Sequence, residues 1–203
     1  MLEGHPRGPV ADTMRLMKAK TAKGLWFVAG IVAGGLLAVA VPLVVLATGV
    51  VDMSAAAPPG ALESAIAPWA LDRSMARHAP RRDNPFKDAA SALPSGMKHY
   101  QANCVICHGA PEVPGAELSL GLNPPVPPLY TKDTQSSTDG QLFWVIRNGI
   151  RMTGMPAFQQ TRTDNEIWQI VAFVRHLPAL TDQERKTLEA AVREEGDHHE
   201  GGG

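Results

Sequence analysis

The two cysteines of the chain fall in one short run, Cys104-Val105-Ile106-Cys107-His108. The C-x-x-C-H pattern is the attachment signature of c-type haem. Because positions three apart share one side of a helical turn, both sulfurs can add to the vinyl groups of a single haem. His108 then lies beneath the porphyrin, where its imidazole can bind the iron. The run therefore predicts one haem c, attached covalently through Cys104 and Cys107.

Two other uses of a C-x-x-C pair fit the sequence less well. A thioredoxin-like redox pair normally follows a strand in a βαβ unit, and no such pattern surrounds Cys104. A zinc site needs about four ligands, and two cysteines with one histidine leave it short. An unprotected thiol pair would also tend to oxidise outside the cytosol, whereas thioether attachment consumes both sulfurs.

An iron with a histidine ligand has a second axial position. Two methionines downstream, Met152 and Met155, are the candidates for it. Met155 lies between Gly154 and Pro156, in a predicted loop between two helices from which a side chain can reach inward. A single methionine is more often a packing residue, so the residues alone leave both methionines open.

The elements that must carry this site begin with a membrane anchor. Residues 25–51 contain no charged side chain, and as a helix they would be about 40 Å long, more than the roughly 30 Å apolar core of a bilayer. A cleaved signal peptide is the alternative, but its apolar region runs only about 7–15 residues. We therefore expect residues 25–51 to form a single transmembrane helix.

The charges on either side of this span predict its orientation. Residues 1–24 carry five basic and two acidic side chains, whereas no Lys or Arg occurs between Val51 and Arg73. By the positive-inside rule, residues 1–24 stay in the cytoplasm and the rest of the chain crosses the membrane. The expected location is the bacterial inner membrane, with the haem domain on the periplasmic side.

Residues 52–80 are rich in alanine and proline, and we expect a semi-extended linker there. Pro58, Pro59 and Pro68 argue against one long helix, although a short helical piece fits residues 62–67. Fully extended, the 29 residues would reach about 90 Å at about 3.1 Å each. Such a linker would let the domain swing between partners.

Residues 81–180 have the pattern of a small all-α domain. Three capping boxes, Thr138 with Gln141, Thr163 with Glu166, and Thr181 with Glu184, each precede a run of apolar residues at helical spacing. Residues 111–129 form a proline-rich loop without strand-like alternation. A further helix is expected over residues 181–195, and the polar residues 196–203 are expected to be disordered. So long a loop in so small a domain suggests that a cofactor completes the core.

With these residues in view, the chain resembles a class I cytochrome c, in the small membrane-anchored or complex-associated bacterial branch. The resemblance covers about residues 83–180 and rests on the haem motif, the proline-rich loop and the segment Gly154-Met155-Pro156-Ala157-Phe158. It implies that Met155 rather than Met152 is the distal ligand, and that a backbone carbonyl at Pro124 or Pro125 accepts a hydrogen bond from His108. It also implies that the last helix of the domain crosses the first, with Gly96, Tyr100, Trp168 and Phe173 at the contact.

The expected function follows from this ligand set. A thioether ligand favours ferrous iron, and two filled axial positions leave no open site for oxygen. We therefore expect single-electron transfer between membrane or periplasmic redox proteins, without an enzymatic activity of its own, by a free shuttle or by the haem subunit of a respiratory complex. The alternative is a haem c enzyme subunit or a gas or redox sensor with an exchangeable sixth ligand.

The composition excludes two other classes of protein. The formal net charge of −1 lacks the basic excess of a nucleic-acid-binding protein. Two cysteines cannot build the disulfide framework of a small secreted domain.

Overall fold

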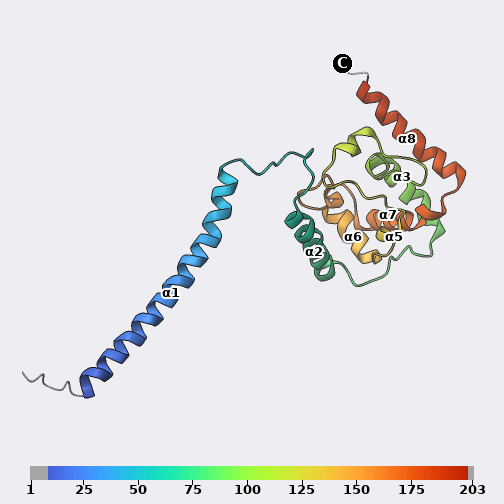
Figure 1. The fold of residues 1–203 in the computed structure, drawn as a ribbon. Helices are drawn as coiled ribbons and strands as arrows, with labels where there is room; N and C mark the ends of the chain where they lie inside the picture. Colours follow the sequence, from blue (N-terminus) through green and yellow to red (C-terminus); the bar gives the residue numbers. More distant parts are fainter. Residues whose placement is uncertain (1–8, 201–203) are drawn as a thin grey trace, which may run out of the picture. The chain divides into compact units, whose positions relative to one another are not determined.

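The structure is a computed structural model that describes the backbone of residues 9–200 and the side chains of residues 23–194. Over this range it is helical and contains no strand, apart from an isolated bridge between Ala110 and Val113 (Figure 1). The all-α prediction is confirmed. The α-helices are α1 Pro9–Ala47, α2 Ala61–His78, α3 Leu93–Asn103, α4 Val105–His108, α5 Lys132–Gln135, α6 Asp139–Asn148, α7 Asp164–His176 and α8 Asp182–Glu200.

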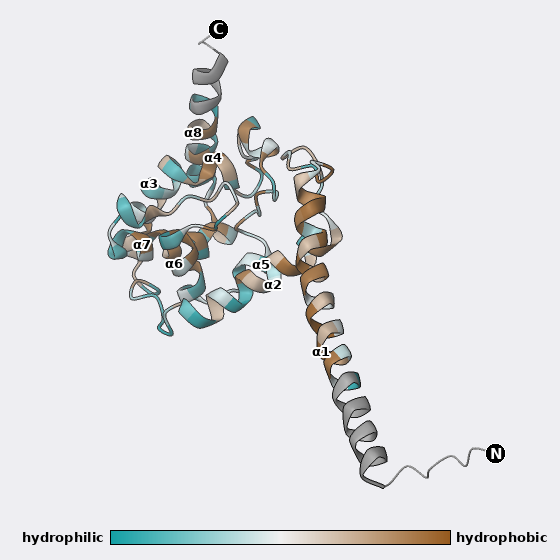
Figure 2. Cartoon of the chain, turned by 90° about the vertical axis from the view of Figure 1, so that its left-hand side faces the viewer, coloured by the Kyte–Doolittle hydropathy of each residue, from teal (hydrophilic) through white to brown (hydrophobic). Residues whose placement is uncertain are grey.

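The chain divides into two compact units, with the boundary between Met53 and Ser54. The first unit contains α1, in which residues Lys23–Ala47 are long and apolar enough to cross a membrane. The residues of this part are exposed, and most of them are hydrophobic (Figure 2). The helix passes through Pro42 and ends four residues before the predicted end of the span at Val51. Residues 1–8 of the predicted cytoplasmic segment lie outside the described residues, as do residues 201–203 of the predicted tail.

The linker predicted over residues 52–80 is wrong for its greater part, because residues 61–78 form the helix α2. Pro68 lies inside this helix and cannot donate a hydrogen bond to the carbonyl of Ser64. Ser64 is exposed, so water near this turn can replace the lost hydrogen bond at low cost. Packing of α2 against α6 outweighs the proline. The ring of His78 stacks on Trp144 of α6, with ring centroids 6.3 Å apart.

The connector before α2 is also held by the second unit. The side-chain amide of Asn123 donates a hydrogen bond of 2.9 Å to the carbonyl of Ala57. Only the residues between Ala47 and Ala57 are therefore available as a tether, with a reach of at most about 35 Å. The expected reach of about 90 Å does not hold.

The three predicted capping boxes are all present. Thr138 and Gln141 exchange hydrogen bonds at the start of α6, and Thr163 and Glu166 do so at the start of α7. At the start of α8, the backbone N–H of Thr181 donates to Glu184, whose own N–H donates to the Thr181 hydroxyl. The helix α8 runs to Glu200, five residues beyond its predicted end.

The core of the second unit forms where α3 crosses α7 (Figure 1). Gly96 permits the crossing, since a Cβ there would lie 2.2 Å from the carbonyl oxygen of Gln169. Next to it, the buried rings of Tyr100 and Phe173 lie 5.4 Å apart. Trp168, which the resemblance also placed at this crossing, stacks on Phe143 of α6 with ring centroids 4.2 Å apart.

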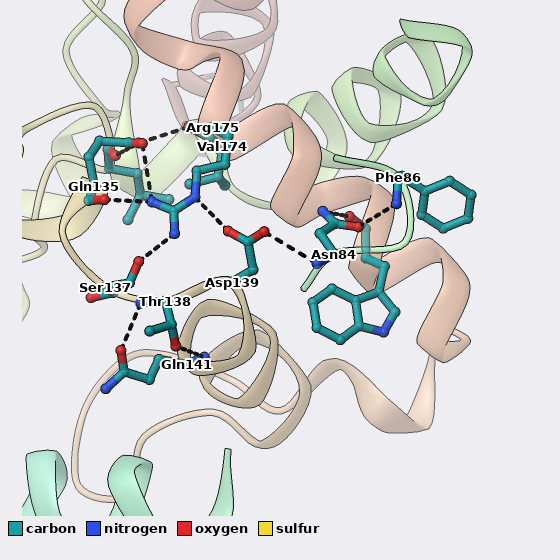
Figure 3. A network of polar contacts seen from close by, with 11 residues as sticks. Asn84, Phe86, Gln135, Ser137, Thr138, Asp139, Gln141, Val174 and Arg175 are labelled. Atoms are coloured by element: carbon teal, nitrogen blue, oxygen red, sulfur yellow. Dashed lines mark hydrogen bonds and ion pairs between the residues drawn. The ribbon is translucent and has the colours of Figure 1, made fainter. Parts of the chain in front are cut away.

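A polar network joins the start of α6 to α7 (Figure 3). The guanidinium of Arg175 pairs with Asp139 at 2.8 Å and donates to the backbone carbonyls of Gln135 and Ser137. The other carboxylate oxygen of Asp139 accepts from the backbone N–H of Asn84, whose buried side chain donates to the carbonyl of Trp168. This network fixes the segment 133–141, which forms the polar part of the site described below.

Candidate functional site

The Cys–His group comprises Cys104, Cys107 and His108. Cys107 and His108 lie on the single turn of α4, and Cys104 is its N-cap residue. Backbone N–H groups of Cys107 and His108 both donate to the carbonyl of Cys104, at 3.1 and 2.8 Å. The turn leads directly out of α3, since the Cys104 N–H donates to the carbonyl of Tyr100 at 2.8 Å. Short-range backbone bonds therefore set the spacing of the three side chains.

The backbone after α4 is folded tightly against the motif. Gly109 adopts φ of +59°, and a Cβ there would lie 2.4 Å from the carbonyl oxygen of Val113. Its own carbonyl accepts a hydrogen bond of 2.6 Å from the buried hydroxyl of Tyr100. Burial raises the pKa of Tyr100, so the phenol remains a donor at any physiological pH. The N–H of Ala116 donates to the carbonyl of Ile106 at 2.7 Å and closes the loop.

The side chain of His108 is oriented by the proline-rich loop. Its Nδ1 lies 2.8 Å from the backbone oxygen of Pro127. A carbonyl can only accept, so Nδ1 carries the hydrogen and Nε2 presents a free lone pair. The predicted acceptors, Pro124 and Pro125, are wrong by two or three residues. The sequence indicates that a backbone carbonyl of the proline-rich loop accepts the hydrogen bond. Which carbonyl faces the ring depends on the path of the loop through space.

The second set of residues is the methionine group, which comprises Met155 with Gly154 and Leu122. The backbone of Met155 is held on both sides, since its N–H donates to the Thr153 hydroxyl at 3.1 Å and its carbonyl accepts from Ile150 at 3.2 Å. Gly154 lies against the side chain of Leu122. The other candidate, Met152, is 85% exposed.

Both groups line one cavity of about 320 Å³, within the usual range for small-molecule sites. Its lining is mostly apolar, with Val145, Ile146, Ile170 and Val174 from α6 and α7. Pro124 and Pro125 also line it, although neither accepts the His108 hydrogen bond. A few polar side chains gather at one part of the lining, and these are Asp133, Thr134, Ser137 and Gln141.

Met75 of α2 also lines the cavity, and the sequence prediction missed it. The reason is that residues 52–80 were interpreted as a linker. A signal was present, because Leu71, Met75 and His78 recur at helical spacing, although Pro68 obscured it.

The protonation states favour a haem over the alternatives. Burial raises the pKa of Cys104 to about 12, and burial also raises the pKa of Cys107. A thioredoxin-like pair needs a thiol with a lowered pKa, and a zinc site needs about four ligands. Burial lowers the pKa of His108, which favours the neutral imidazole that binds iron. Within the described residues, no group of three His, Cys, Asp or Glu side chains could hold a metal ion by itself.

These residues fit a covalently bound haem. Two cysteines, a histidine with a free Nε2 and a methionine line the same apolar cavity, on an all-helical domain in which α3 crosses α7. This combination defines a class I c-type cytochrome domain, that of a haem c electron-transfer protein.

One of the comparisons with known proteins, the match to a family model, agrees with this assignment. Residues 91–174 match the family model described as cytochrome c oxidase, cbb3-type, subunit III. The match contains both groups of lining residues and leaves out α1, α2 and α8. No curated protein matches the chain.

Among solved structures, cytochrome CL from the marine methylotrophic bacterium Methylophaga aminisulfidivorans is similar to the chain. The two share 21% sequence identity, over 64% of this chain and 79% of that one, with a TM-score of 0.38. At this score the likeness adds nothing to the argument, and the assignment rests on the site and the family model.

Proposed function

We propose that the chain is a membrane-tethered cytochrome c with one haem, which passes single electrons between respiratory redox partners on the periplasmic side. His108 and Met155 are its axial iron ligands. The observation that carries this proposal is that both side chains line one apolar cavity beside Cys104 and Cys107.

Each of these residues has a defined task. The bound haem iron supplies one-electron chemistry by alternating between Fe(III) and Fe(II). Pro127 holds the imidazole of His108 in the orientation and tautomer that direct Nε2 at the iron. Thr153 and Ile150 fix the backbone of Met155, so that its sulfur is positioned before the haem is bound. The apolar lining from α6 and α7 keeps water away from the iron.

The cysteines and the two proposed iron ligands also support one haem per chain and no open iron position at which a substrate could react. Each haem c takes two cysteines, and the chain has two. With His108 and Met155 both bound, the iron has no open position for a substrate. The proposed role is therefore electron transfer, either by a mobile carrier or by a subunit of an oxidoreductase complex.

Membrane attachment is proposed through residues 25–51. The apolar part of α1 and the basic excess of residues 1–24 support an inner-membrane anchor with the haem domain in the periplasm. The short tether and the family description, which names an oxidase subunit, both favour a fixed subunit over a shuttle that moves far. Co-purification of the chain from mild detergent would identify its partner complex, and recovery of the chain alone would contradict the subunit form.

The axial ligands are tested by replacing the three methionines separately. Met155→Ala should abolish the methionine–iron charge-transfer band of the oxidised protein, lower the reduction potential and allow the reduced protein to bind CO. Met152→Ala is the matched control, since the side chain is 85% exposed, and its spectrum should not change. Met75→Ala should also keep the band, because Met75 lies on α2, outside the residues that match the family.

The proposal fails if the unmodified protein lacks the charge-transfer band and binds CO when reduced. That result would favour the haem enzyme or sensor with an exchangeable sixth ligand. Loss of the band in Met75→Ala but not in Met155→Ala would transfer the ligand role to Met75.

A further inference from the structure

The helix α2 has two faces with different surroundings. Leu71, Ser74 and Met75 are half-buried against the domain, and Met75 lines the haem cavity. Successive residues of a helix are about 100° apart, so these three share one side of α2 with His78, which stacks on Trp144. This side is the one by which α2 is attached to the domain.

The opposite side of α2 carries large apolar side chains that nothing covers in the second unit. Leu62, Ile66 and Trp69, the apolar stripe, are 74%, 50% and 59% exposed. At about 100° per residue they lie within roughly 60° of one another and nearly opposite Met75. A helix needs such a stripe only if it is to be buried.

Basic side chains continue the apolar stripe toward the end of α2. Arg73 lies in line with the stripe one turn further on, and Arg77 lies beside it. Within the part of the chain that the structure describes, neither arginine has an ion-pair partner, and the acidic residues Glu63 and Asp72 lie on the flanks of the stripe. Helices that lie in a membrane interface bury tryptophan and apolar side chains and keep basic side chains near the lipid headgroups. In α2 the stripe supplies the apolar side chains, and Arg73 and Arg77 supply the basic ones at its C-terminal end.

The position of α2 in the chain brings it to the membrane. The apolar part of α1 ends at Ala47, and the next segment held by the domain begins at Ala57. The tether between them reaches at most about 35 Å. The stripe begins five residues after Ala57, so a tether of this length allows it to reach the lipid surface.

We propose that α2 is an interfacial helix whose apolar stripe enters the headgroup region of the phospholipid bilayer, with Arg73 and Arg77 at the lipid phosphates. Because Met75 on the other face of α2 lines the cavity, this contact would separate that part of the lining from the lipid surface by about one helix diameter, roughly 10 Å. The domain then presents one orientation to partners in the membrane. This inference rests on the membrane anchoring proposed above.

Depth measurement on the full-length protein with haem, in phospholipid nanodiscs, tests the inference. The motif cysteines are consumed by the haem, so a spin label attaches only to an introduced cysteine. Ile66→Cys places the label on the stripe, and Ala67→Cys places it at an exposed position about 100° away. The label at 66 should be accessible to oxygen and shielded from a water-soluble nickel chelate, whereas the label at 67 should show the reverse.

The two proposals fail in different ways in this experiment. If the chain leaves the nanodiscs, the anchoring by α1 is wrong. If it stays and both labels are equally accessible to nickel, the stripe does not contact lipid. That second result overturns the interfacial helix and assigns the stripe to a protein partner.

Binding of the haem domain to vesicles after α1 has been cut off gives a second test that needs no spin label. A protease site within residues 49–55, cut after the protein has folded in vesicles that contain anionic phospholipid, should leave the haem domain partly bound. Replacement of the stripe by Leu62→Ser, Ile66→Ser and Trp69→Ser should weaken this binding at least about tenfold. Leu118→Ser with Leu120→Ser, which removes leucines that are 62% and 84% exposed elsewhere, is the matched control. An equal loss of binding in that control would overturn the assignment to α2.

Discussion

The two groups that line the cavity are built in different ways. The Cys–His group occupies five consecutive residues, and backbone bonds within and next to this run set its geometry. The methionine group draws Met155, Gly154 and Leu122 from loops about 30 residues apart, and Met75 reaches the same cavity from α2. The backbone of the first group is therefore a property of a local sequence, with only the histidine ring oriented from a distance by Pro127, and the second group is a property of the fold.

The largest expected effect is the loss of covalent haem attachment. It distinguishes the Cys–His group, which would bind the haem covalently, from the methionine group, which would supply an iron ligand. Cys104→Ala with Cys107→Ala should abolish haem staining of the chain on a denaturing gel, because no thioether bond remains. Met155→Ala should keep the stain at the level of the unmodified protein. Stable haem staining in the double cysteine variant would refute covalent attachment through this motif.

A pair of glycines, one beside each group, gives the next largest effect. Gly109 has φ of +59° beside the Cys–His group, and Gly149 has φ of +65° beside the methionine group. A Cβ at Gly149 would lie 2.7 Å from the carbonyl oxygen of Met155. Gly109→Ala and Gly149→Ala should each lower the free energy of unfolding by roughly 2–4 kcal/mol, since strain and overpacking add.

The spectra of the two glycine variants should differ. Gly149→Ala should weaken the methionine–iron band, and Gly109→Ala should leave it in place. Gly121→Ala, with nothing within 4 Å of its added Cβ, serves as the control in denaturant unfolding. If Gly109→Ala also removed the band, the two groups would not be independent.

The comparison also shows what the sequence could and could not predict. The capping boxes at Thr138, Thr163 and Thr181 were correct because each joins residues three apart. The Pro127 carbonyl and the helix α2 were not predicted. Both depend on contacts between distant segments, His108 with the proline-rich loop and His78 with Trp144. Pro68 shows why a local pattern is not enough. The proline removes one backbone hydrogen bond from α2, but the packing of α2 against α6 stabilises the helix by more than this loss.

Tyr100→Phe tests how far the Cys–His group depends on the core behind it. The hydroxyl of Tyr100 is buried and donates to the carbonyl of Gly109 at 2.6 Å. Its removal leaves a buried acceptor without a partner, which should cost about 1–3 kcal/mol in unfolding free energy. The haem should remain attached and the methionine band should be retained. A loss below about 0.5 kcal/mol would mean that water replaces the hydroxyl.

The smallest expected effect concerns α7, whose residues Ile170 and Val174 support the cavity behind both groups. Hydrogen bonds from the backbone and hydroxyl of Thr163 lower the pKa of Glu166 from its ordinary value of 4.5, and His99 and Arg162 add to the effect. The lowered pKa means that the folded state favours the charged carboxylate. This stabilisation is complete above pH 4.5 and is lost as the pH falls through the lower pKa of the folded state.

Glu166→Gln separates this titration from the cap itself, since a glutamine can complete the same capping box without a charge. Between about pH 5 and 3, the unfolding free energy should fall less steeply in Glu166→Gln than in the unmodified protein. Thr163→Ala should flatten the same slope and also cost about 1 kcal/mol throughout, because the cap is lost. Neither variant should change the haem stain or the methionine band, because α7 supports both groups equally. A selective loss of the methionine band in acid would instead show that the distant parts of the fold hold Met155 less firmly than the local run holds His108.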